Sequence, residues 1–139
     1  GYNIQTTLES KDIALNCNVI ITATPSKRPL LMSESIQKGT HITAIGSDTS
    51  EKQELDSKIL QMADMVVADS IIQCQSRGEI YQALKAGVLE KDKPVELGNV
   101  IIQKDLQRIS DEEITVADLT GVAVQDVQIS KAVYKAFIS

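Results

Sequence analysis

Short runs of apolar and β-branched residues recur along the chain and predict the strands of a sheet. Four runs are strong, at residues 18–24, 41–46, 65–69 and 114–118, and a weaker one lies at 3–7. Most of them are nearly continuous in apolar character, which is typical of strands buried on both faces of a parallel sheet.

Segments with apolar residues at helical spacing lie between these runs. They predict helices at 8–17, 56–63, 71–86 and 122–138, and a short helix at 96–103 within the otherwise irregular stretch 89–113. Gly87 directly follows the third helix and is a suitable C-cap. Strands that alternate with helices predict an α/β fold with a doubly wound, mostly parallel sheet.

The length and charge of the chain limit how many domains it can form and which partners it can bind. A chain of 139 residues fits one domain. The formal net charge is −5 and there is no long run of Lys or Arg, which argues against nucleic acid or an anionic membrane surface as a partner. Aromatic residues make up only 3 % of the chain, so platforms for stacking bases are not expected. No apolar run approaches the roughly 18 residues of a membrane-spanning helix.

The chain has two cysteines, Cys17 and Cys74, and one histidine, His41. These are too few for a zinc site of the usual Cys/His kind, so no metal site is predicted. Both cysteines fall in helical patterns and are predicted to be small buried residues with free thiols, which fits a reducing cytoplasm. His41 begins a strand, and a structural role is expected for it.

Three small, polar loops follow predicted strands, at residues 22–26, 46–50 and 118–121. Because the carboxyl ends of parallel strands share one edge of a sheet, these loops are expected to converge there. Hydroxyls and the N–H groups at helix N-termini bind phosphate or ribose oxygens, so the edge is a candidate ligand site. Solvated turns with Ser, Thr and Asp caps explain each loop equally well when it is taken alone.

Asp48 is the carboxylate of most interest at this edge. It follows Gly46, which permits a tight turn, and partial desolvation there would raise its pKa and suit it to shuttle protons. An N-cap or an Asx turn is the simpler alternative. Lys52 is expected to be exposed rather than paired with Asp48, and Glu79 is expected to be a surface acid.

Several segments, taken in order, resemble the ornithine cyclodeaminase/mu-crystallin family of NAD(P)-dependent proteins. They are 22–26 with 29–31; 39–42 and 44–48, followed by 52–56; 78–80; 96–98; and 110–116 with 118, 120–121 and 125–127. The resemblance implies a Rossmann-type domain, NAD or NADP as cofactor, a small amino-acid substrate and a homodimeric enzyme.

The resemblance also implies roles for individual residues. The aspartate of the family's Gly-x-Asp turn, a proposed acid/base, corresponds to Asp48. The segments that line the nicotinamide side of the cofactor correspond to Thr22, Ala23, Thr24, Ile45, Gly46, Ser47, Thr120, Gly121 and Val122.

The Gly-rich loop of the family's first βαβ unit has no counterpart here, nor does its dimerisation and substrate domain. Residues 1–139 are therefore expected to be a single NAD(P)-binding, Rossmann-like domain fragment, truncated at its N-terminal end and inactive alone. The leading interpretation of the parent protein is ornithine cyclodeaminase, which converts L-ornithine to L-proline and ammonia by transient hydride transfer. The alternatives are alanine dehydrogenase, ketimine reductase, or a non-catalytic protein that binds NADPH and a ligand.

Overall fold

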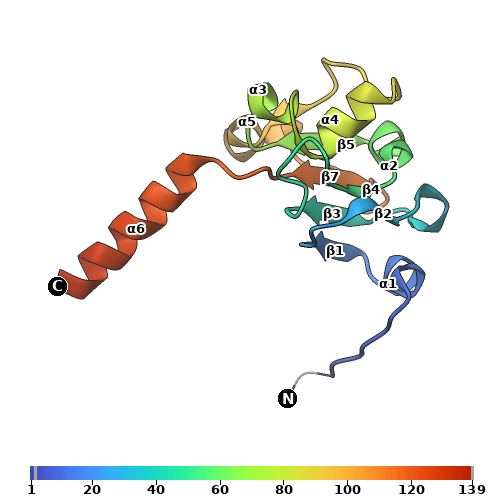
Figure 1. Cartoon of the computed structure of the whole chain (residues 1–139), viewed down its shortest axis with the longest axis horizontal. Coiled ribbons are helices and arrows are strands. Elements are labelled where there is room, and N and C mark those ends of the chain that lie inside the picture. Colours follow the sequence, from blue (N-terminus) through green and yellow to red (C-terminus); the bar gives the residue numbers. More distant parts are fainter. Residues whose placement is uncertain (2, 139) are drawn as a thin grey trace.

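A computed structural model describes residues 1 and 3–138 and contains a five-stranded sheet with short helices around it (Figure 1). Across the sheet the strands are β1 (Val19–Thr22), β3 (His41–Ala44), β7 (Thr115–Asp118), β5 (Met65–Ala68) and β6 (Val95–Glu96). Every neighbouring pair is parallel. The predicted α/β fold and all four strong strands are therefore confirmed.

A second, two-stranded parallel sheet was not predicted. It pairs β2 (Lys27–Leu31) with β4 (Gln53–Leu55). Pro29 lacks a backbone N–H, and the register shifts between Lys27 and Leu31. Strands this short, with Lys, Arg, Pro and Glu among few apolar residues, carry no clear hydrophobic pattern. β4 nevertheless supplies the most important carboxylate of the edge described below.

The helices follow the predicted segments with one break. They are α1 (Ser10–Asn16), α2 (Ser57–Met62), α3 (Ile71–Cys74), α4 (Gly78–Lys85), α5 (Leu97–Ile102) and α6 (Ala123–Ile138), with 3₁₀ turns η1 (Ser33–Ser35) and η2 (Lys104–Leu106). The single helix predicted at 71–86 is wrong, because α3 ends at Cys74 and α4 begins at Gly78, which has a φ of +89°. That left-handed conformation suits glycine and interrupts the helix.

Two further predictions fail near the N-terminus. Residues 3–7 form no strand, and Ile4 is 80 % exposed, because no described strand pairs with this segment. Cys17 is exposed, since it follows the last residue of α1 on the outside of the molecule, whereas Cys74 is buried as predicted. Both thiols are free.

The core lies between the main sheet and its neighbouring helices and consists of aliphatic side chains. Its largest fully buried members are Ile42, Leu55, Ile59, Leu60, Ile80, Val66 and Val116. Three acids are equally inaccessible, namely Glu54, Glu79 and Asp118, which are each no more than 1 % exposed. Buried carboxyl groups are rare without hydrogen-bond partners, so these three direct attention to their surroundings.

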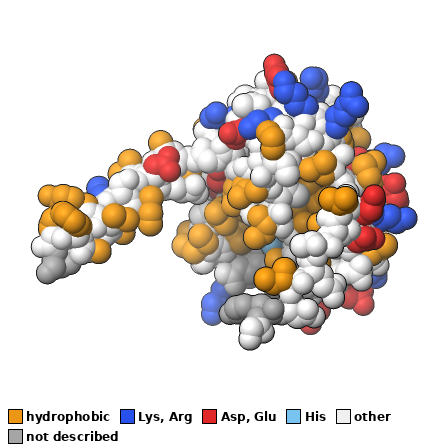
Figure 2. Space-filling view, turned by 60° about the horizontal axis from the view of Figure 1, so that its bottom comes forward, with side chains coloured by type: hydrophobic (Ala, Val, Ile, Leu, Met, Phe, Trp, Pro, Cys, Tyr) orange, Lys and Arg blue, Asp and Glu red, His pale blue; other side chains and the backbone are white. Residues whose placement is uncertain are grey.

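Helix α6 differs from the rest of the fold. It projects away from the sheet, and none of its residues is buried (Figure 1). Hydrophobic side chains are visible along its length (Figure 2). Among residues 1 and 3–138, no helix has the length and apolar character needed to cross a membrane.

Candidate functional site at the carboxyl edge of the sheet

The strand register brings the predicted loops to one edge. Thr22, Ala44 and Asp118 are in register at the ends of β1, β3 and β7. The chain leaves these positions through the loops that begin at Ala23, Ile45 and Leu119. The predicted convergence of the three loops is therefore confirmed.

The side chain of Glu54, on β4, connects the first two loops through hydrogen bonds. Its Oε1 accepts hydrogen bonds from the backbone N–H of Thr24 at 2.6 Å and from the Thr24 hydroxyl at 2.7 Å. Its Oε2 accepts from the Thr22 hydroxyl at 2.8 Å and from the backbone N–H of Gly46 at 2.9 Å. Each carboxylate oxygen thus receives two hydrogen bonds. The two threonine hydroxyls, predicted as ligand donors, direct their protons inward to Glu54.

Gly46 is required where the two loops meet. A Cβ atom at this position would lie 2.6 Å from the carboxyl carbon of Glu54 and 2.5 Å from the backbone nitrogen of Thr24. Both distances are far below van der Waals contact, and one of the neighbours is backbone. Only a residue without a side chain lets the loop after β3 approach the loop after β1 so closely.

Glu79 holds the strand that carries Glu54. Its Oε1 accepts from the backbone N–H of Glu54 at 2.7 Å, and its Oε2 accepts from that of Leu55 at 3.2 Å. Burial raises the pKa of Glu79 to about 8, while these two hydrogen bonds act in the opposite direction. The prediction that Glu79 is a surface acid is wrong, because α4 directs this side chain toward β4.

Asp118 connects the same helix to the third loop. Its Oδ2 accepts from the backbone N–H of Ile80 in the first turn of α4 at 2.8 Å. Burial raises the pKa of Asp118 to about 7. A Cβ on Gly78 would lie 2.5 Å from this Oδ2, which explains the glycine at the start of α4.

Asp69, just after β5, shapes the loop that follows Asp118. Its Oδ2 accepts from the backbone N–H of Gly121 at 2.8 Å, and its Oδ1 accepts from the hydroxyl of Thr120 at 3.2 Å. Gln73 adds hydrogen bonds from its Nε2 to the Thr120 hydroxyl at 2.6 Å and to the Gly121 carbonyl at 2.7 Å. The Thr120 hydroxyl is therefore engaged within the protein, and Gly121 and Val122 form the accessible part of this loop.

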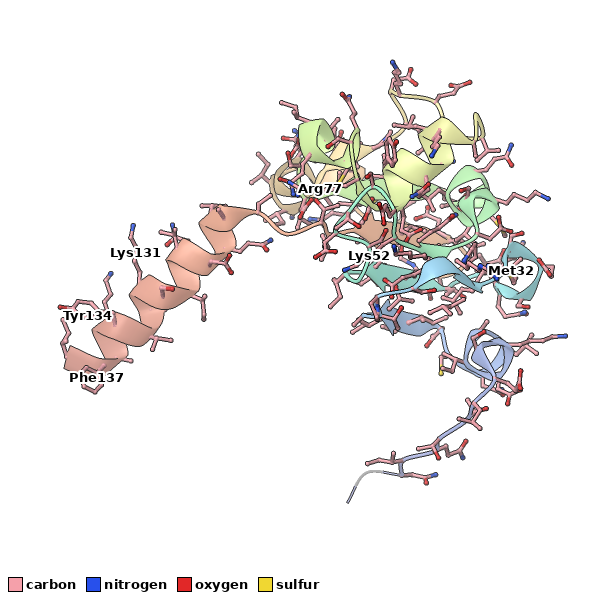
Figure 3. All side chains as sticks on the ribbon, in the orientation of Figure 1. Met32, Lys52, Arg77, Lys131, Tyr134 and Phe137 are labelled. Carbon is pink, nitrogen blue, oxygen red and sulfur yellow. The ribbon has the colours of Figure 1, made fainter. Side chains whose placement is uncertain are left out.

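Asp48 lies on the surface of the second loop. Its side chain is 53 % exposed and forms an ion pair with Lys52 at 2.6 Å. The hydrogen bond from Lys52 lowers the pKa of Asp48, and the nearby guanidinium of Arg77 acts in the same direction. Lys52 and Arg77 are labelled in Figure 3. The expected raised pKa and the expected unpaired Lys52 are both wrong, because the ammonium lies beside a solvated carboxylate.

The surface offered to a ligand consists of small and apolar residues. Ala23 and Gly121 are exposed, and Ile45 is 44 % exposed. Ser47 is buried and donates its hydroxyl to the carbonyl of Lys52 at 2.8 Å. The loops therefore present backbone and apolar side chains outward, while their hydroxyl groups hold them together. Such a surface fits a flat, partly apolar ring better than a phosphate.

Sequence reasoning missed Glu54 and Glu79 as members of this region. Both look like ordinary surface acids, since most of their partners lie more than 20 positions away in the chain. The lone His41 has the structural surroundings expected of it, with ring nitrogens 2.7 Å from the Thr115 hydroxyl and 3.0 Å from that of Thr43. Within residues 1 and 3–138, no three His, Cys, Asp or Glu side chains are grouped as metal ligands.

Comparison with known proteins matches residues 1–139 to the sequence profile of the ornithine cyclodeaminase/mu-crystallin family. Alanine dehydrogenase of Archaeoglobus fulgidus is 42 % identical over 137 residues, which cover 98 % of this chain and 42 % of that protein.

Two solved structures are also similar. An archaeal alanine dehydrogenase dimer with bound NAD superimposes with a TM-score of 0.84 and is 42 % identical, over 91 % of this chain and 39 % of its own. The Δ1-pyrroline-2-carboxylate reductase of Thermococcus litoralis, in complex with NADH and L-proline, also has a TM-score of 0.84 and is 25 % identical, over 90 % of this chain and 39 % of its own. The chain thus spans less than half the length of these relatives.

Proposed function

The chain belongs to the ornithine cyclodeaminase/mu-crystallin family, and from this premise we propose that it is the dinucleotide-binding part of an NAD(P)-dependent enzyme acting on a small amino acid or its imine. The observation that carries the proposal is the set of three small loops at the carboxyl edge, two of which are joined by Glu54. In parallel α/β sheets this edge is where nucleotides bind. The proposed cofactor-binding residues are Thr22, Ala23, Thr24, Ile45, Gly46, Ser47, Thr120, Gly121 and Val122.

The remainder of the enzyme is part of the proposal. Because the chain spans less than half of its relatives, we propose that the parent protein adds a first βαβ unit with the Gly-rich loop and a domain for substrate binding and dimerisation. Residues 1–139 alone are proposed to be inactive. The similarity to an alanine dehydrogenase dimer supports a homodimeric parent. The two free thiols support a cytoplasmic location.

Asp48 is the proposed catalytic residue. A bound nicotinamide would supply hydride transfer at the α-carbon of the amino acid. Asp48 presents an ionised carboxylate at the carboxyl edge, which would accept a proton from the nitrogen of the resulting iminium. Its exposure at the carboxyl edge leaves it open to a substrate held by the other domain.

Oxidation of alanine or reduction of a small imine is the favoured reaction, since the alanine dehydrogenase relative is 42 % identical over nearly the whole chain. Ornithine cyclodeaminase is a second candidate. Asp48 is compatible with it as well, because attack of a side-chain amine on the imine also needs a nearby base to remove a proton. Both reactions share the hydride step, and their products distinguish them.

The test is a titration of the full-length protein with NAD⁺ and NADP⁺, followed by L-alanine or L-ornithine. Net NADH formation with alanine supports the dehydrogenase, whereas proline and ammonia from ornithine without net NADH support the cyclodeaminase. Dinucleotide binding without turnover of any amino or imino acid would favour a binding protein of the mu-crystallin kind. A parent that binds neither dinucleotide would refute the proposal.

The variant Asp48→Asn tests the catalytic role. We expect kcat to fall by about 10²–10⁴-fold while dinucleotide affinity stays the same, since a general base contributes to the reaction and not to cofactor binding. Glu51→Gln is the matched control, because Glu51 is also exposed and also pairs with a lysine, Lys27, at 2.7 Å. Turnover unchanged in Asp48→Asn would remove Asp48 from the mechanism.

A further inference from the structure

Glu54 is a buried acid whose side-chain hydrogen bonds all lead to the proposed cofactor loops. We propose that Glu54 is a positioning residue, which sets the spacing between loops 22–24 and 45–47 and thereby the shape that receives the nicotinamide end of the dinucleotide. This inference rests on the proposed function. Glu54 itself is fully buried, so it acts through the loops and does not touch a ligand.

Four donors surround the carboxyl group of Glu54. Two backbone N–H groups and two hydroxyls point at its two oxygens, at 2.6 to 2.9 Å. A carboxylate accepts on both of its oxygens and donates from neither, which matches this set of four donors. Hydrogen bonds to a charged acceptor are about twice as strong as neutral ones, so this side chain fixes both loops firmly.

The four donors to Glu54 come from the ends of two different strands. Three come from Thr22 and Thr24 after β1, and the fourth comes from Gly46 after β3. One side chain therefore crosslinks the ends of two neighbouring strands. Because Gly46 has no room for a Cβ against Thr24 and Glu54, the distance between the loops is fixed from both sides.

Glu54 is in turn held from the third loop. Its backbone N–H donates to Glu79 of α4, and the first turn of α4 donates to Asp118 at the end of β7. Two residues later the chain reaches Thr120 of the third cofactor loop. Buried carboxyl groups thus relate all three loops to one another.

A residue whose only role was to fill the core would not be expected to carry a carboxyl group. A carboxylate is costly to bury, and an apolar side chain of similar volume often stabilises a core as well or better. All four donors to its carboxylate lie in the loops at the edge, so removing the charge disturbs loop geometry first.

The substitution Glu54→Gln tests the inference in the full-length protein. Whichever oxygen the amide replaces, either the N–H of Thr24 or that of Gly46 then faces an NH₂ group, because backbone N–H groups cannot turn to become acceptors. We expect the KM and the Kd for the dinucleotide to rise about tenfold, which corresponds to the loss of one charge-assisted hydrogen bond. The KM for the amino acid should stay within about twofold, since its site is built by other residues.

A merely structural role predicts a different pattern. It would lower the melting temperature and the fraction of active enzyme, and hence kcat, with the dinucleotide KM unchanged. That pattern would overturn the inference while leaving the proposed function intact. Wild-type protein without any dinucleotide binding would overturn both. Glu51→Gln, an exposed acid three positions away, is the control and should change neither constant.

Thr22→Val is the second variant, in case Glu54→Gln does not fold. It removes one of the four hydrogen bonds and keeps the carboxylate and the shape of the side chain. The dinucleotide KM should rise by about threefold, less than in Glu54→Gln, because three donors remain. An unchanged dinucleotide KM in Thr22→Val would contradict the positioning role.

Discussion

The carboxyl edge of the sheet and helix α6 are maintained by different interactions. At the edge, buried carboxyl groups accept hydrogen bonds from loops that are distant in sequence, as Glu54 does from Thr22 and Thr24. In α6 no residue is buried, and Phe137 is 88 % exposed. Figure 3 shows Lys131, Tyr134 and Phe137 on this helix, away from the sheet. The edge therefore depends on tertiary contacts, whereas α6 depends on local backbone hydrogen bonds. A substitution of a given kind should therefore change the free energy of unfolding more at the edge than in α6.

The largest effect is expected for Gly46→Ala. The new methyl group would collide with the backbone of Thr24 and with Glu54, and neither neighbour can withdraw without breaking hydrogen bonds. We expect the free energy of unfolding to fall by about 3 kcal/mol. Chemical denaturation measures this change.

Gly98→Ala is the matched control for this substitution. Gly98 lies in α5, and a Cβ there would meet nothing within 4 Å. Alanine favours helix over glycine by about 1 kcal/mol, so this variant should be slightly more stable than the wild type. Equal destabilisation by both alanines would contradict the close packing inferred at Gly46.

The same contrast explains which features the sequence predicts. The strands β1, β5 and β7 lie in nearly continuous apolar runs and β3 lies in an alternating one, so local pattern identifies them and their shared edge. The break between α3 and α4 depends on how Gly78 packs against Asp118, which no local pattern reveals. The predicted strand ends indicate the loops of the site, and the family resemblance assigns them to the nicotinamide side of the cofactor.

Neither the local pattern nor the family resemblance identifies the buried acids of the site. Glu54 and Glu79 each bind groups more than 20 residues away, and an isolated acid in a sequence is usually solvated. The expected pKa of Asp48 failed for a similar reason. Its sign depends on whether Lys52 folds back on it, which spacing alone leaves open.

The second prediction concerns the pH dependence of stability and tests the role of the buried acids. The folded pKa of Glu79 is about 8, above its ordinary value of 4.5, so the native state binds more protons than the unfolded state between these limits. The stability from this group is complete below about pH 4.5 and is lost as the pH rises through about 8. Asp118, with a pKa of about 7, acts in the same direction. The melting temperature should therefore fall from pH 5 to pH 9.

Glu79→Gln isolates this contribution. The amide cannot ionise, so the decline in melting temperature between pH 6 and pH 9 should become shallower. The amide also places a donor near one backbone N–H, so the variant should be less stable at low pH, and the slope is the quantity to compare. Glu51→Gln, on the surface, should keep the wild-type slope. A Glu79→Gln slope equal to that of the wild type would mean that Glu79 ionises normally in the folded protein.

The smallest effect is expected in α6. Phe137→Ala removes a large side chain that is 88 % exposed, and alanine is the better helix former, so the free energy of unfolding should change by no more than about 0.5 kcal/mol. Leu55→Ala, at a fully buried position beside Glu54, should instead lose about 2–5 kcal/mol. Denaturation of the 139-residue chain measures both variants under the same conditions. If Phe137→Ala lost more than about 1 kcal/mol, α6 would have to pack against other residues in solution, and the contrast between the two regions would no longer hold.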